Sequence, residues 1–591
     1  MSITGAGPSR DNRMQEHEME LPNRRSILGA SLLGAAGILA LPQEKAHAVT
    51  STPSGINVRD YGAKGDGVSN DSAAVKAAIE AAKGDLIFFP SGVYLLDRIA
   101  ITDTADMLLG IGAELKHVTN SPGNFMFSQT GRFFRIRGGT IDGNKANQSG
   151  RPIVIAASLS SGRQLILDGV HFKNTVKAAV YIQNFGGECD MHNCLITDQA
   201  QHDTTPGNST AIVHVISGQA NSFATLKFNF NRCIFTDDVA HAGSNPGGVF
   251  VAVGAPANGF RATFEAIGNY FYGYGQNCAG NVIAALHVYP YTEGARWIGN
   301  YFEASSLSAM YAKCLEDFIC TDNYITSGVT STVNVASEGA IGYAPAYHAG
   351  DTAHPRAVIS NNIITSPGGQ PDRVQNGISI FGSPTSKATQ IVVSGNILND
   401  TGTGIQATYS SDITIDTNIV NTTSTQAATH GGIRLDYCDD VSIRNNRITT
   451  NAGHGIYLIY GMTNARITIQ NNSIFQRVHG LYGIIAQGMK SLHISGNEIE
   501  AESHAVTFRA YAGHKIGRLF WDSSNNIIKG LFLPYYGEID SVNGDLSYSG
   551  SPVGTVPAGG PGVRYTSTNA SRGSVYWVST KAGKDGWVAL A

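Results

Sequence analysis

Side chains that can move protons or bind charges recur at or near one position of a repeated strand pattern in this chain. The candidate catalytic residues are His287, Lys313, Arg434, Asp436, Asp237 and Asp238. A second set of residues could bind substrate: Tyr289, Tyr311, Tyr457, Phe381 and Gln406. Aromatic side chains can stack on sugar rings, and arginine or lysine can pair with a uronate carboxylate. The two sets together have the chemistry to bind a ring that carries an acidic group.

One reaction that suits these residue types is β-elimination at a uronic acid. The enzyme must neutralise the carboxylate, remove the acidic proton beside it and protonate the leaving oxygen. Arg434 would neutralise the carboxylate. Lys313 or His287 would be the base. The acid would be a tyrosine, either Tyr289 or Tyr311.

The rival reaction is hydrolysis, which needs two carboxylates about 5 to 10 Å apart around the scissile bond. The acidic candidates are Asp436 and the loop pair Asp237-Asp238, which comes just before GGVFVAV. We favour elimination, because cationic and phenolic residues are more frequent at the candidate positions than paired carboxylates. Arg434 and Asp436, two residues apart on one strand face, could also form an exposed ion pair of little energy.

The elements that must position these residues are short strands. Gly432–Thr450, GIRLDYCDDVSIRNNRITT, reads as three strands that alternate apolar and polar residues, with a turn at Asn445-Asn446. Its step of Asn, any residue and an Ile-like residue recurs from HNCLI (192–196) to NNIIK (525–529), at spacings of about 22 to 39 residues. This repeat predicts an all-β fold, a single-stranded parallel β-helix in which each rung pairs with its neighbours.

Residues 1–48 have the features of a targeting signal, and we do not expect them to be part of the fold. They contain Arg24-Arg25, an apolar stretch rich in Gly and Ala, and an Ala-His-Ala exit at 46–48. The pattern predicts a twin-arginine signal peptide and a periplasmic or extracellular mature protein. The apolar stretch is too short and too rich in Gly for a good membrane anchor, so we expect no membrane contact after signal removal.

The first module of the mature chain is Ile56–Leu96, INVRDYGAKGDGVSNDSAAVKAAIEAAKGDLIFFPSGVYLL. It predicts a strand, a Gly-rich turn, a helix over Ala73–Lys83 with its N-cap at 70–72 and its stop at Gly84, and two further strands. A helix here would cap the apolar end of the first rung. Through its DYGAKGDG…NDSAA…FFPSGVY pattern, the block closely resembles the N-terminal signature of the pectate-lyase/rhamnogalacturonase-like (epimerase-like) superfamily of right-handed parallel β-helix proteins.

The resemblance implies a right-handed helix and a carbohydrate-active enzyme, and we expect that it cleaves a polysaccharide. In this superfamily the strand that opens each rung usually lines the substrate groove, and setting the repeats in register puts the candidate residues on its outer face. The superfamily also contains hydrolases, epimerases and phage tail spikes. The alternatives to a lyase are therefore a glycoside hydrolase or glycosyl transferase with paired Asp or Glu, and a non-catalytic glycan-binding or tail-spike-like protein.

The repeat ends after about residue 530, and residues 531–591 predict a small β-module from short aromatic strands with Gly turns. This segment resembles the one that follows the β-helix in some tail spikes and related trimeric enzymes, which implies a homotrimer. The expected organisation is a signal peptide at 1–48, a β-helix at 49–530 that includes the first module at 56–96, and the C-terminal module.

Composition and short motifs exclude several other functions. A formal net charge of −4 without a polybasic stretch gives no nucleic-acid footprint. The seven cysteines are scattered without a CxxC pair, which disfavours zinc and predicts buried free thiols. Gly453-His454-Gly455 resembles the GHG of polygalacturonases, but the other triplets of that family are lacking, so we expect His454 to be a turn residue. No cofactor or metal site is expected, although one Ca²⁺ bridging a uronate is left open.

Overall fold

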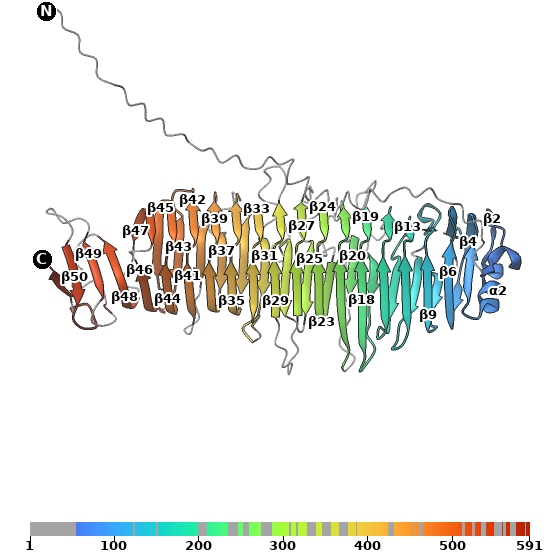
Figure 1. The fold of residues 1–591 in the computed structure, drawn as a ribbon, viewed down its shortest axis with the longest axis horizontal. Helices are drawn as coiled ribbons and strands as arrows, with labels where there is room; N and C mark the ends of the chain where they lie inside the picture. The colour runs from blue at the N-terminus through green and yellow to red at the C-terminus, as the bar shows by residue number, and fades with distance from the viewer. Residues whose placement is uncertain are drawn as a thin grey trace, which may run out of the picture. The chain divides into compact units, whose positions relative to one another are not determined.

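The computed structural model describes the chain from Gly55 onward, with gaps. The described residues are 55–121, 125–148, 150, 152–198, 210–234, 246–251, 259–273, 286–305, 309–314, 317–327, 339–345, 356–365, 376–385, 387–423, 431–451, 453–459, 465–510, 514–522, 526–533, 539–548, 558, 563–567, 575–585 and 587–590. They belong to one compact unit, Gly55–Ala591, whose strands are drawn in Figure 1. The predicted signal peptide at 1–48 lies outside the described residues.

Three ladders of parallel strands build the fold, and through most of the chain each strand pairs with the strand three places later. The first ladder contains the strand that opens each rung. Its members are β5 (Ile99–Ile101), β8 (Phe125–Gln129), β11 (Ile153–Ser158), β14 (Val180–Gln183), β17 (Thr210–Val215), β20 (Pro246–Val251), β23 (Leu286–Ile298), β25 (Met310–Cys314), β28 (Ile341–Pro345), β31 (Asn376–Phe381), β34 (Thr403–Thr408), β37 (Gly431–Asp436), β40 (His454–Ile459), β43 (Tyr482–Gln487) and β45 (Glu498–Arg509).

The second ladder is the longest and shares β23 with the first. Its other members are β1 (Ile56–Asn57), β3 (Leu86–Phe89), β6 (Thr104–Leu109), β9 (Phe133–Arg137), β12 (Gln164–Asp168), β15 (Glu188–His192), β18 (Phe223–Asn229), β21 (Arg261–Ile267), β26 (Asp317–Thr321), β29 (Arg356–Ser360), β32 (Ile391–Ser394), β35 (Ser411–Asp416), β38 (Asp439–Arg444), β41 (Arg466–Gln470), β44 (Met489–Ser495), β46 (Ile516–Asp522), β48 (Ile539–Tyr548) and β49 (Arg564–Ser567).

The third ladder closes each rung and shares β45 with the first. Its other members are β2 (Asp66–Asn70), β4 (Gly92–Leu96), β7 (Ala113–His117), β10 (Thr140–Asp142), β13 (His171–Lys173), β16 (Leu195–Thr197), β19 (Arg232–Ile234), β22 (Tyr270–Tyr272), β24 (Tyr301–Ser305), β27 (Tyr324–Ser327), β30 (Ile363–Thr365), β33 (Ile397–Thr401), β36 (Ile419–Thr422), β39 (Arg447–Thr450), β42 (Ser473–Gln476) and β47 (Ile527–Leu533).

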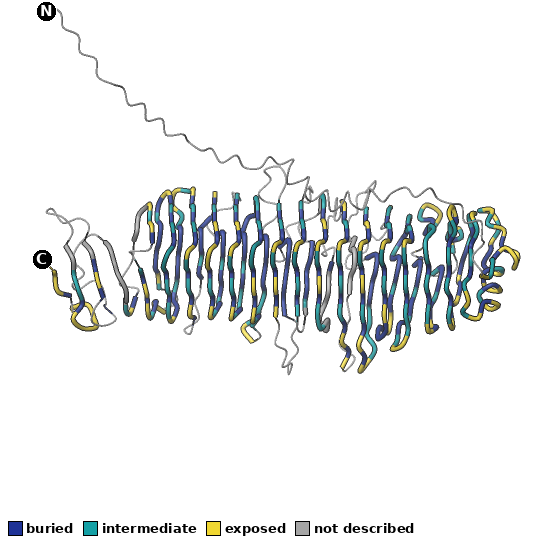
Figure 2. Tube along the Cα trace, viewed as in Figure 1, coloured by how far each residue is buried: buried dark blue, intermediate teal, exposed yellow. Residues whose placement is uncertain are grey.

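The three strands predicted within Gly432–Thr450 are confirmed as β37, β38 and β39. Each contributes a fully buried isoleucine to the core, namely Ile433, Ile443 and Ile448. Such inward residues repeat rung after rung, and Figure 2 shows buried residues along the strands of the ladders. Parallel crossovers are almost always right-handed. The fold is thus the predicted right-handed parallel β-helix.

A buried ladder of amides explains the recurring asparagine of the repeat. Eleven described asparagines form it: Asn231, Asn269, Asn300, Asn323, Asn362, Asn396, Asn418, Asn446, Asn472, Asn497 and Asn526. The backbone N–H of Asn418 donates to Oδ1 of Asn446 at 2.9 Å. Asn446 Nδ2 in turn donates to Oδ1 of Asn472 at 2.9 Å and to the Ile415 carbonyl at 3.0 Å. Buried amides must be paired, and this chain of bonds pairs them.

The turn of each repeat is made by the residue before the ladder asparagine. In Asn445-Asn446, the first residue has φ +56°, in the left-handed region, while the second enters the ladder. In HNCLI the sequence is offset by one: Asn193 has φ +56°, and Cys194 donates its backbone N–H to Asn231. The prediction that asparagine makes the turn is therefore right for Asn445. For Asn446 it missed the hydrogen bonds of the amide ladder.

The first module contains the predicted helix and the two strands after it, β3 and β4, but its opening strand β1 is only Ile56–Asn57, and Val58–Tyr61, expected to continue that strand, form a short helix. Helix α2 (Ser72–Ala82) follows β2, and the short helix η1 (Val58–Tyr61) precedes it. Asp71 is the N-cap residue, but its side chain makes no cap bond and accepts the backbone N–H groups of Lys64 and Gly65 at 2.7 and 3.2 Å. Asp71 thus stabilises the Gly-rich turn instead of the start of the helix. Figure 1 shows α2 at the blue end of the ladders, and its capping role stays a prediction.

Parallel pairing continues beyond residue 530, since β46 pairs with β48 and β48 with β49. Only then does the direction change, because β50 (Val575–Ser579) pairs antiparallel with β49 and with β51 (Trp587–Leu590). The C-terminal strands are therefore continuous with the second ladder. Among the described residues, no helix is long and apolar enough to cross a membrane.

Candidate functional site

The outer face of the first ladder carries most of the candidate residues in two adjacent columns. In one column, Ser379, Gln406, Arg434 and Tyr457 are partners on successive strands β31, β34, β37 and β40. In the other, Phe381, Thr408, Asp436 and Ile459 lie opposite one another in the same order. The alternating pattern of the strands therefore predicted the register of Gln406, Arg434 and Tyr457 correctly.

Arg434 and Asp436 form an ion pair in the middle of these columns. The Nη2 and Nε atoms of Arg434 lie 3.0 and 3.1 Å from Oδ2 of Asp436. Only 10% of the Asp436 side chain and 22% of the Arg434 side chain are exposed. The expectation of an exposed pair is wrong, because both side chains are largely buried.

The carboxylate of Asp436 is under opposing influences. Burial raises its pKa above the ordinary value, and the charge and hydrogen bond of Arg434 pull that pKa down only in part. Its second oxygen, Oδ1, is buried and has no hydrogen-bond partner in the described part of the chain. A buried carboxylate oxygen without a partner is a costly feature that native proteins rarely keep without a use.

Aromatic rings extend the site from Arg434 toward the next two rungs. The guanidinium carbon of Arg434 lies 6.0 Å from the Tyr457 ring centroid, at the outer limit of a cation–π contact. The ring of Tyr457 meets His454 edge-on at 4.7 Å, and His454 stacks on Tyr482 at 5.2 Å. The cluster ends at Arg509, whose guanidinium lies 5.2 Å from the Tyr482 ring.

His454 is a strand residue and not the predicted turn residue. It is the first residue of β40 and is 5% exposed. Its Nδ1 accepts the backbone N–H of Tyr482 at 3.1 Å, which places the proton of the neutral ring on Nε2. His454 and Tyr482 thus belong to the site, although neither is among the candidate residues. The sequence feature that could have identified them is their position, since each is the first residue of its strand, β40 and β43, one rung apart.

Tyr311, Lys313 and Phe381 form a second group on the same face. The Lys313 ammonium lies 5.6 Å from the Tyr311 ring centroid, and Tyr311 packs with Ala344 and Phe381. Strand β25, which carries Tyr311 and Lys313, is four strand positions from β37. At the usual strand spacing this is about 19 Å. Lys313 and Arg434 therefore cannot act on one bond, although both can contact one extended ligand.

The remaining candidates are only partly described. His287 and Tyr289 lie in β23, where His287 is the partner of Tyr311, but their side chains are outside the described part of the structure. Asp237 and Asp238 lie outside the described residues altogether. Their proposed roles stay predictions.

No group of three or more His, Cys, Asp or Glu residues suited to a metal ion occurs among the described residues. The cysteines Cys189, Cys194, Cys233, Cys320 and Cys438 are buried free thiols, and burial raises their pKa values. Thiols of this kind stay protonated and behave as small apolar side chains, as expected.

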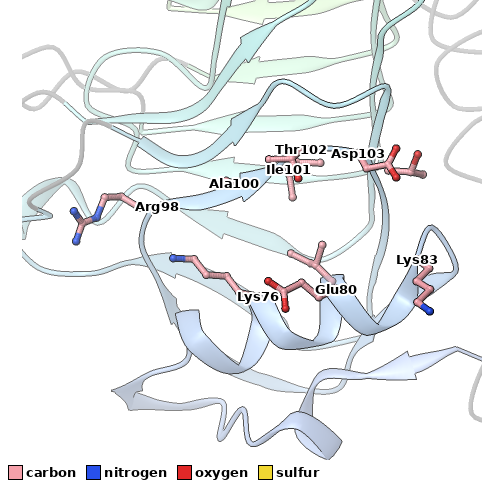
Figure 3. Close-up of a pocket in the computed structure, with 10 residues that line it drawn as sticks. Lys76, Glu80, Lys83, Arg98, Ala100, Ile101, Thr102 and Asp103 are labelled. Carbon is pink, nitrogen blue, oxygen red and sulfur yellow. The ribbon is translucent and has the colours of Figure 1, made fainter.

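Two cavities lie away from this cluster, nearer the start of the chain. One of about 610 Å³ separates α2 from β5, with Lys76 and Glu80 on the helix and Arg98 and Asp103 beside the strand (Figure 3). Another of about 350 Å³ lies over the first ladder and is lined in part by Tyr181. Neither is lined by a predicted catalytic residue.

Two family models match the chain. Residues 55–251 match the family described as Rhamnogalacturonase A/epimerase, pectate lyase-like, and residues 317–499 match the one described as Right handed beta helix region. The resemblance inferred from the first module, and the handedness of the helix, are thereby confirmed.

Curated relatives match over a short segment. The chain is 30% identical over 115 residues to Mannuronan C5-epimerase AlgE4 and 31% identical over 114 residues to Mannuronan C5-epimerase AlgE6, both from Azotobacter vinelandii. The matches cover 16% and 15% of this chain. They span only 21% and 13% of the two relatives.

Solved structures of low identity are similar to parts of the chain. The surface protein and adhesin PfbA of Streptococcus pneumoniae has 16% identity and a TM-score of 0.42, covering 70% of this chain and 99% of its own. Tailspike protein 3 of Bacteriophage CBA120 has 14% identity and a TM-score of 0.40, covering 96% of this chain and 77% of its own.

Proposed function

We propose that the protein is a carbohydrate-active enzyme that removes the C5 proton of a uronate in a polysaccharide, at Arg434 and Asp436. The observation that carries the proposal is the buried ion pair with one carboxylate oxygen left unpartnered among the described residues. The family description matched at 55–251 and the mannuronan relatives support a uronate-containing glycan as substrate.

Arg434 is the group that neutralises the substrate carboxylate. A guanidinium has five N–H donors and can hold Asp436 and a second carboxylate together. Neutralising the carboxylate makes the neighbouring C5 proton more acidic. The raised pKa of Asp436 makes its carboxylate a stronger base for that proton than an ordinary aspartate.

We favour β-elimination as the outcome. The Asp436 carboxylate takes the C5 proton, and the electron pair of that C–H bond forms the double bond between C4 and C5. The bond from C4 to the glycosidic oxygen breaks, and the leaving oxygen takes a proton from the Tyr457 hydroxyl. Asp436 then releases its proton to water, and Tyr457 regains one. Tyr457 has this role because it is the partner of Arg434 on the next strand.

The test is a screen of uronate-containing and neutral polysaccharides for two products: reducing ends, and the ultraviolet absorbance of an unsaturated sugar. The proposal predicts both together, on uronate polymers alone. Reducing ends without the absorbance would mean hydrolysis, and would point to Asp436 together with Asp237 or Asp238, the acidic candidates for that reaction.

Epimerisation is the second candidate, favoured by the two mannuronan C5-epimerases. It begins with the same loss of the C5 proton, but a proton returns to C5 from the opposite side and no bond of the chain breaks. Incubating polymannuronate in deuterated water separates the two reactions. Epimerisation places deuterium at C5 without new reducing ends, whereas elimination yields unsaturated ends.

We also propose export by the twin-arginine route and assembly as a homotrimer. An apolar column on the outer face of the third ladder supports the assembly: it consists of Tyr270, Tyr301, Tyr324, Ile363, Ile397 and Ile419, which are partners on six successive strands. Tyr301 is 36% exposed and Ile419 40% exposed. A further copy of this chain would bury the column. Light scattering of Ile419→Lys and of wild type tests this, and the variant should no longer form the trimer. A trimer that persists in the variant would show that this column is not part of the interface.

A further inference from the structure

Two tyrosines occupy a turn position where the backbone disfavours them. Tyr409 and Tyr437 are the residues directly after β34 and β37, with φ +45° and +56°. At the same position the chain uses Asn184 after β14 and Gly488 after β43, with φ +50° and +48°. Glycine and asparagine accept the left-handed region readily, and a bulky side chain there costs about 1–2 kcal/mol. The chain therefore has two strained tyrosines at a position where other rungs have asparagine or glycine, which adopt this backbone with less strain.

The two rings form a single stacked unit. Their centroids are 4.5 Å apart and their planes differ by 1°. Stacking contributes about 0.5–1.5 kcal/mol, which offsets the strain only in part. Backbone strain of this kind is concentrated at functional sites, because other parts of the fold must hold it in place.

The pair is attached to the Arg434–Asp436 ion pair. Asp436 directly precedes Tyr437, and its carbonyl accepts the backbone N–H of Tyr409 at 2.9 Å. One rung earlier, the same position is Gly382. A Cβ atom there would lie 1.9 Å from the Tyr409 carbonyl oxygen, so only glycine fits at this position beside the backbone of Tyr409.

We propose that Tyr409 and Tyr437 form an aromatic platform that binds a sugar ring next to the uronate held by Arg434. The proposal deepens the proposed function and rests on it. Its ligand is a pyranose ring of the same polysaccharide chain, bound through its apolar C–H face, which is the contact that tyrosine rings offer. The platform thus fixes the position of the chain along the first ladder relative to Asp436.

The experiment measures strain and binding in the same variants. Tyr409→Asn and Tyr437→Asn, singly and together, are made in an Asp436→Asn background so that the polymer is not consumed. Kd values for polygalacturonate and polymannuronate are measured beside Tm. The double variant should bind about tenfold more weakly, about 1.4 kcal/mol, without a fall in Tm. Tyr437→Phe keeps the ring and should keep the affinity.

Phe230→Asn is the matched control. Phe230 also has a left-handed backbone, with φ +58°, and is 56% exposed on another turn. This variant should relieve similar strain and leave both Kd values unchanged. Unchanged Kd in the double tyrosine variant, or no binding by the Asp436→Asn parent, overturns the platform. Loss of affinity in a protein whose wild type cleaves nothing would support the platform and overturn only the proposed reaction.

Discussion

Oδ2 of Asp436 lies 3.0 Å from the guanidinium of Arg434, while Oδ1 of the same carboxylate is buried and has no partner among the described residues. An ion pair built for stability would satisfy both oxygens, because an unpaired buried oxygen costs about 1–3 kcal/mol. The asymmetry suits a carboxylate that must accept a proton from a substrate.

Conservative changes to this pair should slow the reaction strongly with little effect on the fold. Asp436→Asn removes the base and should lower kcat/KM for a uronate polymer by about 10²–10⁴, the usual contribution of a general base. Arg434→Lys keeps the charge but loses the planar fork and should also lower kcat/KM.

The matched controls are Asp416→Asn and Arg444→Lys, since Arg444 Nε and Asp416 Oδ2 form a more exposed pair, 3.2 Å apart, on the second ladder. These changes should leave kcat/KM within about twofold of wild type. Equal losses in both pairs would mean that Asp436 acts only through the fold.

The pH dependence of activity should follow the ionisation of Asp436. Burial raises its pKa, so the carboxylate becomes a competent base only at a pH above the ordinary range of aspartate. The acid limb of kcat/KM should therefore lie above pH 3.8, the ordinary value. The same shift disfavours the charged form, so this group's contribution to stability is present at low pH and declines as pH rises through the raised pKa. A limb at or below the ordinary value would contradict the role of base.

The asparagine ladder should be a main source of stability. Asn446→Leu removes the hydrogen bonds that Asn446 makes with Asn418, Asn472 and Ile415. The buried polar groups of these three residues then lose their partner. We expect a loss of about 3 kcal/mol or more in the free energy of unfolding, measured by denaturant titration. Asn445→Gly, at the left-handed position just before it, should change that free energy by less than about 1 kcal/mol. Similar effects at the two positions would contradict the division between turn and ladder.

A buried histidine should make the fold sensitive to acid. Burial, with a smaller effect of Lys177, lowers the pKa of His214 to about 4 from 6.5. The folded protein resists protonation that the unfolded chain accepts, so stability is lost as pH falls from 6.5 toward 4. This loss is up to about 3 kcal/mol at 1.36 kcal/mol per pKa unit. His214→Phe should remove part of it, seen as a smaller drop in Tm between pH 7 and pH 4.5 than in wild type. Equal drops would show that other groups control acid unfolding.

Much of the fold is predictable from alternation alone. The strands within Gly432–Thr450 and the register of Gln406, Arg434 and Tyr457 follow from the period of two in their sequences. The ladder role of Asn446 does not follow, because its partners Asn418 and Asn472 are 28 and 26 residues away and come together only when rungs of unequal length stack.

The site was harder to predict, for three physical reasons. Lys313 and Arg434 are far apart along the helix. The alternation in the sequence shows which residues face outward, but it does not show which of them lie close enough to act on the same bond of a substrate. Burial depends on turns beside the strands, so Asp436 was expected to be exposed. The left-handed backbone of Tyr409 and Tyr437 has no sequence signature, since turn residues are sought among glycine and asparagine.

The most direct test of the account is proton exchange at C5. Wild type and Asp436→Asn are incubated with a uronate polymer in deuterated water, and C5 deuterium and unsaturated ends are followed by nuclear magnetic resonance. The account predicts that wild type breaks the C5–H bond, giving unsaturated ends or, in an epimerase, deuterium at C5, and that Asp436→Asn does neither. Intact C5–H bonds in every product of the wild-type enzyme would contradict it.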